Sequence, residues 1–279
     1  FLWVTMEWIR SFGPLGFPWA NLATTQTVFL PVIQMVDITG SEGIGFWLLL
    51  VNVVLYITLQ SEGNRKKMLL CLLVLFLLPW VIGLLRLPAY EFDEETPHRE
   101  VAVLQPNINP NQKWEASFRS RLFEIMDSLN AEAMSMDPDL VLWPEAALPV
   151  YMRVSSKRQD YEWLVIEKGI PILMGTVDFK RDSTGRRVYN SSIYISLEGN
   201  KIYHKKFLVP FAEYIPMSEN FPDLKKLNFG QASFTAGKEF TTFHLDSILF
   251  SNMICYESSH PAVARGFVQN GARFLTIEA

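Results

Sequence analysis

Cys255 stands at the end of an apolar run, in SNMICYESSHP (251–261), directly before residues that favour the start of a helix. A cysteine reacts as its thiolate, which a helix N-terminus or a nearby cation stabilises. Ser258, Ser259 and Pro261 are typical of a helix start, and HPAVARGFVQNGA continues from them. Cys255 is therefore either a nucleophile at a turn between strand and helix or a small apolar residue of the core.

Two other stretches place charged side chains beside apolar runs. In LVLWPEAALP, Glu145 directly follows an apolar strand and lies between a proline and two alanines, so its carboxylate needs a partner or a function. In YHKKFLVPFAEYIP, Lys205 and Lys206 precede an apolar segment, and Glu213 lies further on. Taken singly, Glu145 is also compatible with a solvated charge at a strand end, and the lysines with a solvated turn.

The sequence gives little indication of a metal site or of a surface that binds nucleic acid. The histidines are scattered, at 98, 204, 244 and 260, and the two cysteines, at 71 and 255, lack the C-x-x-C spacing of a metal site. The net charge is −4, and no basic patch has the size or aromatic interleaving that nucleic acid requires. We therefore expect no metal and no nucleic acid partner.

The elements ahead of these residues indicate a membrane. The chain is 49% hydrophobic and contains eight tryptophans, more than a soluble domain of 279 residues needs. Residues 68–87 lack acidic side chains and, at about 1.5 Å per helical residue, can cross an acyl core about 30 Å thick. Residues 44–59 form a second predicted span. The basic residues 65–67 between the spans are typical of the cytoplasmic side, so the chain after residue 87 is expected across the membrane.

The first residues, FLWVTMEWI, contain neither an initiator methionine nor a basic segment ahead of the apolar stretch. This pattern is not that of a signal peptide, and we expect a fragment cut inside a membrane span. Prolines and acidic residues interrupt residues 17–43, which predicts a loop and an interfacial helix.

A second domain follows the acidic linker EFDEETPHRE. We expect a transmembrane helical region over 1–87 and a separate domain over 88–279. Residues 101–108 and 139–145 are predicted buried strands, and a polar, helix-like segment over 112–136 separates them. This alternation of strand and helix is typical of a layered α/β domain.

The later part of this domain is rich in β-forming residues. RVYNSSIYISLEGNKIYH (187–204) has turn residues between two such runs, which predicts a hairpin. FHLDSILFSNMIC (243–255) is a further predicted strand that ends at the cysteine.

Three motifs, taken in order, resemble those of the nitrilase superfamily, whose catalytic site combines glutamate, lysine and cysteine. They are WPE at 143–145, Y-x-K-x-x-L-V-P-F-x-E-Y at 203–214 and CYE at 255–257. Because apolar spans precede the domain, the chain is most similar to the apolipoprotein N-acyltransferase family. EWIRSFGPLGFPW and QMVDITGSEGIGFW near the N-terminus are similar to that family too, so the resemblance covers nearly the whole chain.

The resemblance implies a fold and three roles. The fold would be a nitrilase-like α-β-β-α sandwich preceded by transmembrane α-helices. Cys255 would be the nucleophile, Glu145 the general base, and Lys205 the cation that stabilises the tetrahedral oxyanion. The motif register selects Lys205 over Lys206, because Tyr203 fixes the lysine two positions later.

The family also implies a reaction. A fatty acyl chain would pass from a phospholipid to Cys255 as a thioester, and then to the α-amine of the N-terminal diacylglyceryl-cysteine of a bacterial lipoprotein. The kinetics would be ping-pong, and no cofactor would be needed. The partners would be the phospholipid donor, the diacylglyceryl apolipoprotein acceptor and the bilayer. The protein would be a multi-pass protein of the bacterial cytoplasmic (inner) membrane, with its catalytic domain on the periplasmic face.

Four further residues match supporting positions of the family. Glu213, Tyr256 and Glu257 are expected to support or line the site, with Glu257 a candidate for pairing with Lys205. Trp114 matches a tryptophan near the entrance for the acyl chain.

The chain departs from the family at two places. Ala212 stands where glycine is common in PFGEY, and the sequence stops at RFLTIEA, where the family continues with more of the sandwich and a final membrane span. The resemblance therefore indicates a C-terminally truncated domain. One alternative is a membrane-tethered nitrilase-type amidase that hydrolyses a small amide. Another is a non-catalytic binding module, but the three intact catalytic positions argue against it.

Overall fold

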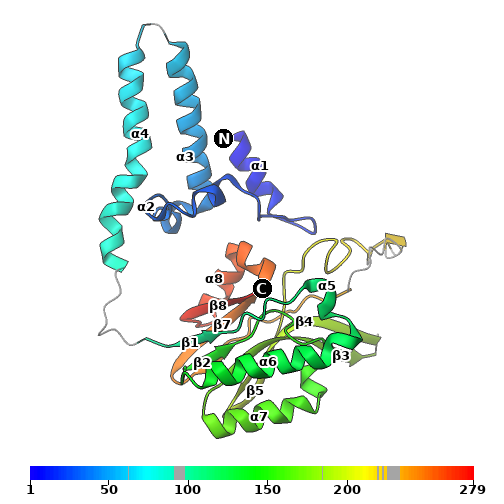
Figure 1. Ribbon diagram of the computed structural model, residues 1–279. Helices are drawn as coiled ribbons and strands as arrows, with labels where there is room; N and C mark the ends of the chain where they lie inside the picture. The colour runs from blue at the N-terminus through cyan, green and yellow to red at the C-terminus, as the bar shows by residue number, and fades with distance from the viewer. Residues whose placement is uncertain (62, 91–97, 184, 219, 222, 225–232) are drawn as a thin grey trace. The chain divides into compact units, whose positions relative to one another are not determined.

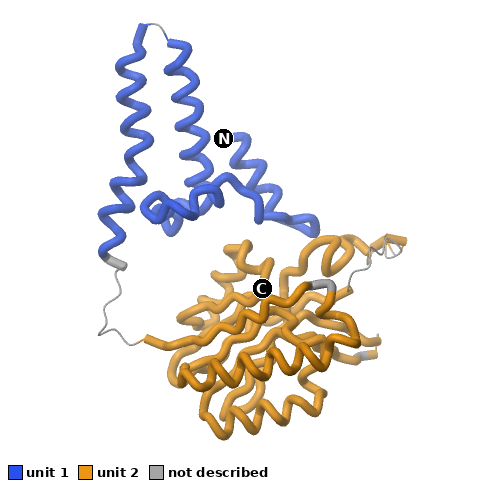
Figure 2. The backbone as a smooth tube through the Cα atoms, in the orientation of Figure 1, with its two compact units in different colours: residues 1–97 blue, residues 98–279 orange. Residues whose placement is uncertain are grey.

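The chain forms two compact units. A computed structural model describes residues 1–279 apart from 62, 91–97, 184, 219, 222 and 225–232. The units are Phe1–Pro97 and His98–Ala279 (Figure 2). Most of the predicted acidic linker, residues 91–97, lies outside the described residues.

The first unit is helical. Its elements are α1 (Leu2–Arg10), the 3₁₀ helix η1 (Leu22–Gln26), α2 (Leu30–Ile33), α3 (Val36–Gln60), α4 (Arg65–Arg86) and the 3₁₀ helix η2 (Leu87–Tyr90). The long helices α3 and α4 contact each other and contain the two predicted spans (Figure 1). Both helices are long and apolar enough to cross a bilayer, and most of their side chains are not buried within the protein.

Helix α3 begins earlier than the predicted span. Gly40, with φ 69° and ψ 178°, interrupts the helix, and this left-handed φ favours glycine. Asp37, in the turn before this break, forms an ion pair with Arg86 at the end of α4. The sequence predicted a loop and one interfacial helix over residues 17–43, and the structure has two short helical elements, η1 and α2, and the start of α3 there.

The second unit contains two sheets. The first has the order β1-β2-β3-β4-β5, with β1, β2 and β3 parallel and β3, β4 and β5 antiparallel. The second has the order β6-β7-β8, with an antiparallel β6–β7 pair and a parallel β7–β8 pair. The strands are β1 (Val101–Val103), β2 (Leu140–Leu142), β3 (Ile172–Asp182), β4 (Gly185–Ser196), β5 (Gly199–His204), β6 (Phe243–Leu245), β7 (Ile248–Ile254) and β8 (Phe274–Glu278).

Helices complete the α-β-β-α layers. Helices α6 (Arg119–Met134) and α7 (Lys157–Lys168) cover one face of the first sheet, and α8 (Pro261–Gln269) packs against β7 (Figure 1). The shorter elements are α5 (Pro110–Lys113) and the 3₁₀ helices η3 (Ala116–Phe118), η4 (Met152–Val154) and η6 (Cys255–Ser259).

Alternation along the strands separates two apolar cores. In β2, Val141 packs with the helices α6 and α7, whereas Leu140 and Leu142 pack with residues of the second sheet. Polar contacts also join the two sheets, since Asn252 of β7 donates to the hydroxyl of Ser192 on β4 at 2.8 Å. The predicted sandwich is therefore present.

Three sequence expectations need correction. Residues 243–255 form the β6–β7 hairpin and not one strand, because Asp246 takes a left-handed φ of 51° between the two strands. The helix-like segment 112–136 is broken, and its long helix α6 begins only at Arg119. Strand β3, which pairs with both β2 and β4, was not predicted. The predicted hairpin over 187–204 is confirmed by the antiparallel β4–β5 pair.

Candidate active site

Cys255, Glu145 and Lys205 come together from the ends of three strands. Cys255 directly follows β7, Lys205 directly follows β5, and Glu145 lies three residues beyond β2. The Nζ atom of Lys205 lies 3.4 Å from Oε1 of Glu145. The Cys255 thiol is close enough to both the Glu145 carboxylate and the Lys205 ammonium for electrostatic interaction. The three candidate catalytic residues thus form one cluster between the sheets.

The backbone at Cys255 turns sharply. Its φ of 49° is left-handed, a conformation that is uncommon for residues other than glycine and that often marks functional sites. The turn η6 follows at once, and the Ser258 hydroxyl donates to the Cys255 carbonyl oxygen at 2.7 Å. This turn directs the half-buried cysteine out of the path of β7.

The predicted helix start does not act on the thiol directly. Helix α8 begins only at Pro261, and a 3₁₀ turn lies between it and Cys255. Burial raises the pKa of the Cys255 thiol, as does the negative charge of Glu145, while the positive charge of Lys205 opposes this rise. The resting cysteine is therefore a neutral thiol at neutral pH, and its reaction requires a base. Glu145 is in place to be that base.

Lys205 is a buried cation held by two carboxylates. Its side chain is 1% exposed, and Nζ lies 2.9 Å from the Glu213 carboxylate in addition to its contact with Glu145. Burial lowers the pKa of Lys205, but the charges of Glu145 and Glu213 outweigh this effect and raise it above its ordinary value. The site therefore keeps a fixed positive charge beside the thiol.

Asn190 joins the two carboxylates and was missed in the sequence. This residue of β4 donates through Nδ2 to Oε1 of Glu145 at 2.7 Å and to Oε1 of Glu213 at 2.8 Å. The backbone carbonyl oxygen of Asn190 accepts a hydrogen bond from the backbone N–H of Lys205 at 2.9 Å. The sequence contains a signal that could have identified Asn190, because the polar run NSS interrupts an otherwise apolar strand in RVYNSSIYIS.

The expectation that Glu257 pairs with Lys205 is wrong. Among the described residues, the ion pairs of Lys205 are with Glu145 and Glu213. The buried carboxylate of Glu257 instead accepts hydrogen bonds from the Tyr203 hydroxyl and from three backbone N–H groups. Two of these N–H groups follow Lys205 and the third precedes Cys255, so Glu257 ties the lysine segment to the cysteine turn.

Lys206 points away from this cluster. Its Nζ atom lies 3.8 Å from the centroid of the Phe240 ring and donates to the carbonyl oxygen of Lys238. The geometry therefore agrees with the motif register, which selects Lys205.

The loop that carries Glu145 is fixed from several sides. The buried Trp143 indole donates to Asn130 of α6 at 2.9 Å, and the Lys113 ammonium donates to the carbonyl oxygen of Glu145 at 2.9 Å. Burial lowers the pKa of Lys113, and attraction by Glu145 partly opposes this change. The sequence did not single out Lys113, which precedes the predicted Trp114.

The remaining candidates differ in their surroundings. Tyr256 is buried and contacts His260 edge to face, while Trp114 is 57% exposed on the loop after α5. Ala212 causes no strain, because the left-handed residue in this turn is its neighbour Phe211, with φ 62°. Within the residues that the structure describes, no group of three histidine, cysteine or acidic side chains could hold a metal ion.

Gly175 offers a test of the Glu145 loop. A Cβ atom at this position would lie 2.4 Å from the Pro144 carbonyl oxygen and 2.6 Å from the Cα atom of Glu145. Gly175→Ala should therefore displace the carboxylate, and a shift of about 1 Å at a reacting group can cost about a hundredfold in rate. We expect a large fall in the rate at which Cys255 is acylated, with the protein still folded.

Gly63→Ala is the matched control, because a Cβ atom there meets no atom within 4 Å. Intact-mass measurements of the adduct over time, together with thermal melting, would check both variants. A Gly175→Ala protein with the unchanged rate would show that the close packing of this loop does not position Glu145.

The fold and the site define a class of protein. Residues 100–279 match the family model described as carbon-nitrogen hydrolase, and the chain belongs to that family. Residues 1–54 match the model described as the apolipoprotein N-acyltransferase N-terminal domain.

The chain is also similar to curated proteins of one name. The chain is 34% identical over 284 residues to a protein from Geobacter metallireducens named apolipoprotein N-acyltransferase, covering 98% of this chain and 54% of that protein. It is 31% identical over 307 residues to a protein of the same name from Chlorobaculum tepidum, covering 99% and 58%. The chain thus spans about half the length of the curated relatives it matches. Among solved structures, the carbon-nitrogen hydrolase from Helicobacter pylori is 17% identical with a TM-score of 0.46, covering 65% of this chain and 60% of that one.

Proposed function

We propose that this chain carries the active site of an apolipoprotein N-acyltransferase. One observation carries the proposal: the similarity to a relative of that name extends over 98% of the chain. It therefore includes both apolar helices and the cluster of Cys255, Glu145 and Lys205. A catalytic domain joined to membrane-spanning helices suits substrates that both carry acyl chains.

The first half-reaction uses the proton carried by Cys255. Glu145 accepts the thiol proton as the sulfur attacks the ester carbonyl carbon of a phospholipid, and the Lys205 ammonium stabilises the resulting oxyanion. The ester C–O bond then breaks, Glu145 returns the proton to the departing oxygen, and a lysophospholipid leaves. The acyl chain remains on Cys255 as a thioester.

The second half-reaction uses the same groups, with Cys255 as the leaving group. The α-amine of the diacylglyceryl-cysteine attacks the thioester carbonyl, and Glu145 accepts a proton from the attacking nitrogen. The C–S bond breaks, the proton returns to the sulfur, and an amide is formed. Glu213 and Asn190 contribute by holding Glu145 and Lys205 in position throughout.

Apolar side chains beside the site support lipid substrates. The segment that follows Lys205 carries exposed large apolar side chains, namely Phe207, Phe211, Met217 and Phe221. Soluble domains seldom expose so many large apolar groups in one segment without a binding function. We infer that this segment, together with Trp114, contacts acyl chains.

The membrane arrangement is part of the same proposal. Residues 1–87 would form the membrane region and residues 88–279 the catalytic domain of a multi-pass protein of the bacterial inner membrane. The basic residues 65–67 between α3 and α4 favour a cytoplasmic position for that loop and a periplasmic position for the catalytic domain.

The test is intact-mass spectrometry of the protein in detergent with phospholipid. We expect a fatty-acyl mass on the wild type that hydroxylamine removes and that Cys255→Ala never acquires. Adding a diacylglyceryl apolipoprotein should discharge this adduct. Folded protein that forms no adduct with lipid but releases ammonia from small amides would replace the proposal with an amidase.

A further inference from the structure

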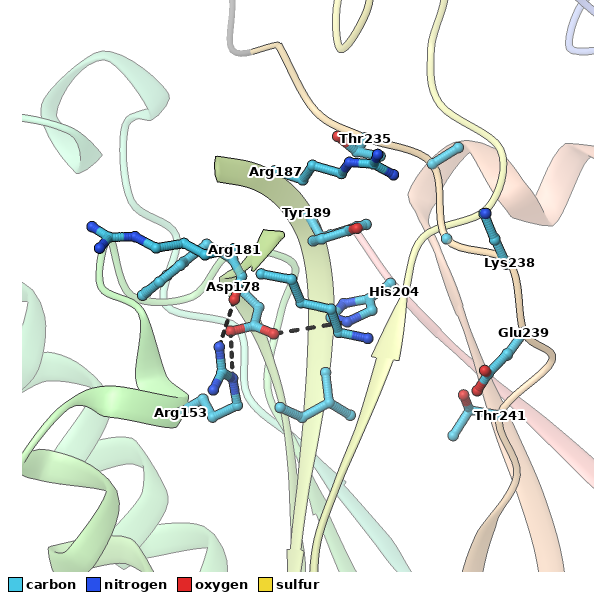
Figure 3. A pocket seen from close by; sticks show the side chains of 15 residues that line it. Arg153, Asp178, Arg181, Arg187, Tyr189, His204, Thr235, Lys238, Glu239 and Thr241 are labelled. Carbon is cyan, nitrogen blue, oxygen red and sulfur yellow. Dashed lines mark hydrogen bonds and ion pairs between the residues drawn. The ribbon is translucent and has the colours of Figure 1, made fainter. Parts of the chain in front are cut away.

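A pocket lies away from the proposed active site. It has a volume of about 670 Å³, and strands β3, β4 and β5 and residues 235–241 line it (Figure 3). His204 and Ile202 belong to this lining, whereas the intervening Tyr203 reaches Glu257 on the side of the second sheet. Because neighbouring strand residues point to opposite faces, the pocket and the cluster around Cys255 use opposite faces of the first sheet.

Positive charge dominates the pocket lining. Its cationic residues are Arg153, Lys180, Arg181, Arg187 and Lys238, and its acidic residues are Asp178 and Glu239. Arg153 is already neutralised, because its Nε atom donates to Oδ1 of Asp178 at 2.8 Å. Lys180, Arg181 and Lys238 form no ion pair with any residue that the structure describes. These exposed cations leave the pocket with a net attraction for anions.

The floor of the pocket is buried and closely packed. Asp178 is 1% exposed, and the Tyr189 ring stacks on His204 with 4.3 Å between ring centroids. The Ser191 hydroxyl lies 2.9 Å from Nδ1 of His204. Burial and the charge of Lys180 lower the pKa of His204 to about 4, so the imidazole is neutral at neutral pH.

One acceptor at this floor lacks a donor. The Oδ2 atom of Asp178 is buried and accepts no hydrogen bond from the residues that the structure describes. Nε2 of His204 lies 3.8 Å from it, which is too long for a hydrogen bond. An unsatisfied buried carboxylate oxygen is costly, and a hydroxyl group of a ligand would satisfy it. The pocket volume is within the range of small-molecule sites, so it can hold more than a single inorganic ion.

We propose that this pocket binds a phosphate ester that also carries a hydroxyl group. The phosphate lies between the exposed ammonium groups of Lys180 and Lys238, and the hydroxyl donates to Oδ2 of Asp178. The ester is either a soluble metabolite or the headgroup of a phospholipid, and the two share this chemistry.

Isothermal titration calorimetry of the detergent-solubilised protein with four probes tests the proposal. These are sn-glycerol 3-phosphate, propyl phosphate, inorganic phosphate and dihexanoyl phosphatidylglycerol. We expect glycerol 3-phosphate to bind about tenfold more tightly than propyl phosphate, which lacks the free hydroxyls. Binding of the short-chain lipid alone would assign the site to a headgroup, and comparable binding of glycerol 3-phosphate would assign it to a soluble ester.

Lys180→Glu and Lys168→Glu form a matched pair for the charge requirement. Both lysines are exposed, but Lys168 lies in the last turn of α7, outside the pocket. We expect Lys180→Glu to weaken binding of the tightest probe at least about tenfold, and Lys168→Glu to leave it within about twofold. Absence of binding by every probe, binding of propyl phosphate with the same affinity as glycerol 3-phosphate, or equal weakening by both variants would overturn the proposal. None of these readouts depends on acyl transfer.

Discussion

Glu145→Gln should lower the rate of Cys255 acylation by about 10²–10⁴-fold while the protein remains folded. The amide has the shape of the carboxylate, and its oxygen can still accept the hydrogen bond that Asn190 donates at 2.7 Å. What it loses is the ability to take the thiol proton. Because burial raises the pKa of the Cys255 thiol, few molecules hold a thiolate that could react without a base.

The pH dependence of this variant provides a second readout. Below the pKa of the thiol, the thiolate fraction rises about tenfold for each pH unit, so the residual acylation rate of Glu145→Gln should rise with the same slope. The substitution also removes the negative charge of Glu145 that helps to raise this pKa, so the rise should level off at a lower pH than it would with that charge present.

Glu124→Gln is the control, because Glu124 lies on α6 with a side chain that is 65% exposed. The same substitution there should leave the rate within about twofold of the wild type. Initial rates of adduct formation over a series of pH values would check both variants. A Glu145→Gln protein with a near-normal rate would remove Glu145 from the role of base.

Glu145, Lys205 and Cys255 were assigned because three motifs, taken in order, resemble those of the nitrilase superfamily. In the structure the ends of β2, β5 and β7 bring these residues together. The contacts that these residues and Glu257 make depend on the path of the backbone, which the local sequence does not indicate. Glu257 was predicted to pair with a charge, but its position in the turn η6 brings it to backbone N–H groups instead.

The strands were predicted only in part. Strand β3 was missed because its second half, VDFKRD, is polar and resembles a loop when read alone. In the fold its backbone pairs with β4 along its whole length, so pairing and not local propensity determines it. The β6–β7 turn was missed because it uses Asp246 in a left-handed conformation, without the glycine that commonly marks such turns.

Lys205→Met should reduce both stability and acylation. The ammonium is 1% exposed and lies between Glu145 and Glu213, so its removal leaves two partly buried carboxylates with no cation between them. Removing one partner of a buried ion pair costs about 3–5 kcal/mol of unfolding free energy. Loss of the oxyanion-stabilising charge should also lower the acylation rate by about 10²–10³-fold.

The wild-type contribution of Lys205 has a defined pH range. The pKa of Lys205 is raised in the folded protein, so its ion pairs stabilise the fold fully below the ordinary lysine pKa of 10.5. This holds as long as the pH is high enough for the two carboxylates to be ionised. This contribution is lost as the pH rises through the raised pKa. The melting temperatures of the wild type and Lys205→Met should therefore differ most near neutral pH and converge in strong alkali.

A second substitution separates the two effects of Lys205. Lys205→Met combined with Glu213→Gln removes one of the two facing charges, so it should recover part of the lost stability without recovering acylation. Lys206→Met is the matched control, since that ammonium lies over Phe240 and outside the cluster, and it should retain the acyl adduct. Chemical denaturation and intact-mass kinetics would measure both properties in the three variants. If Lys206→Met lost the adduct and Lys205→Met kept it, the assignment of the oxyanion-stabilising lysine would pass to Lys206, against the register of the motif and the geometry of the site.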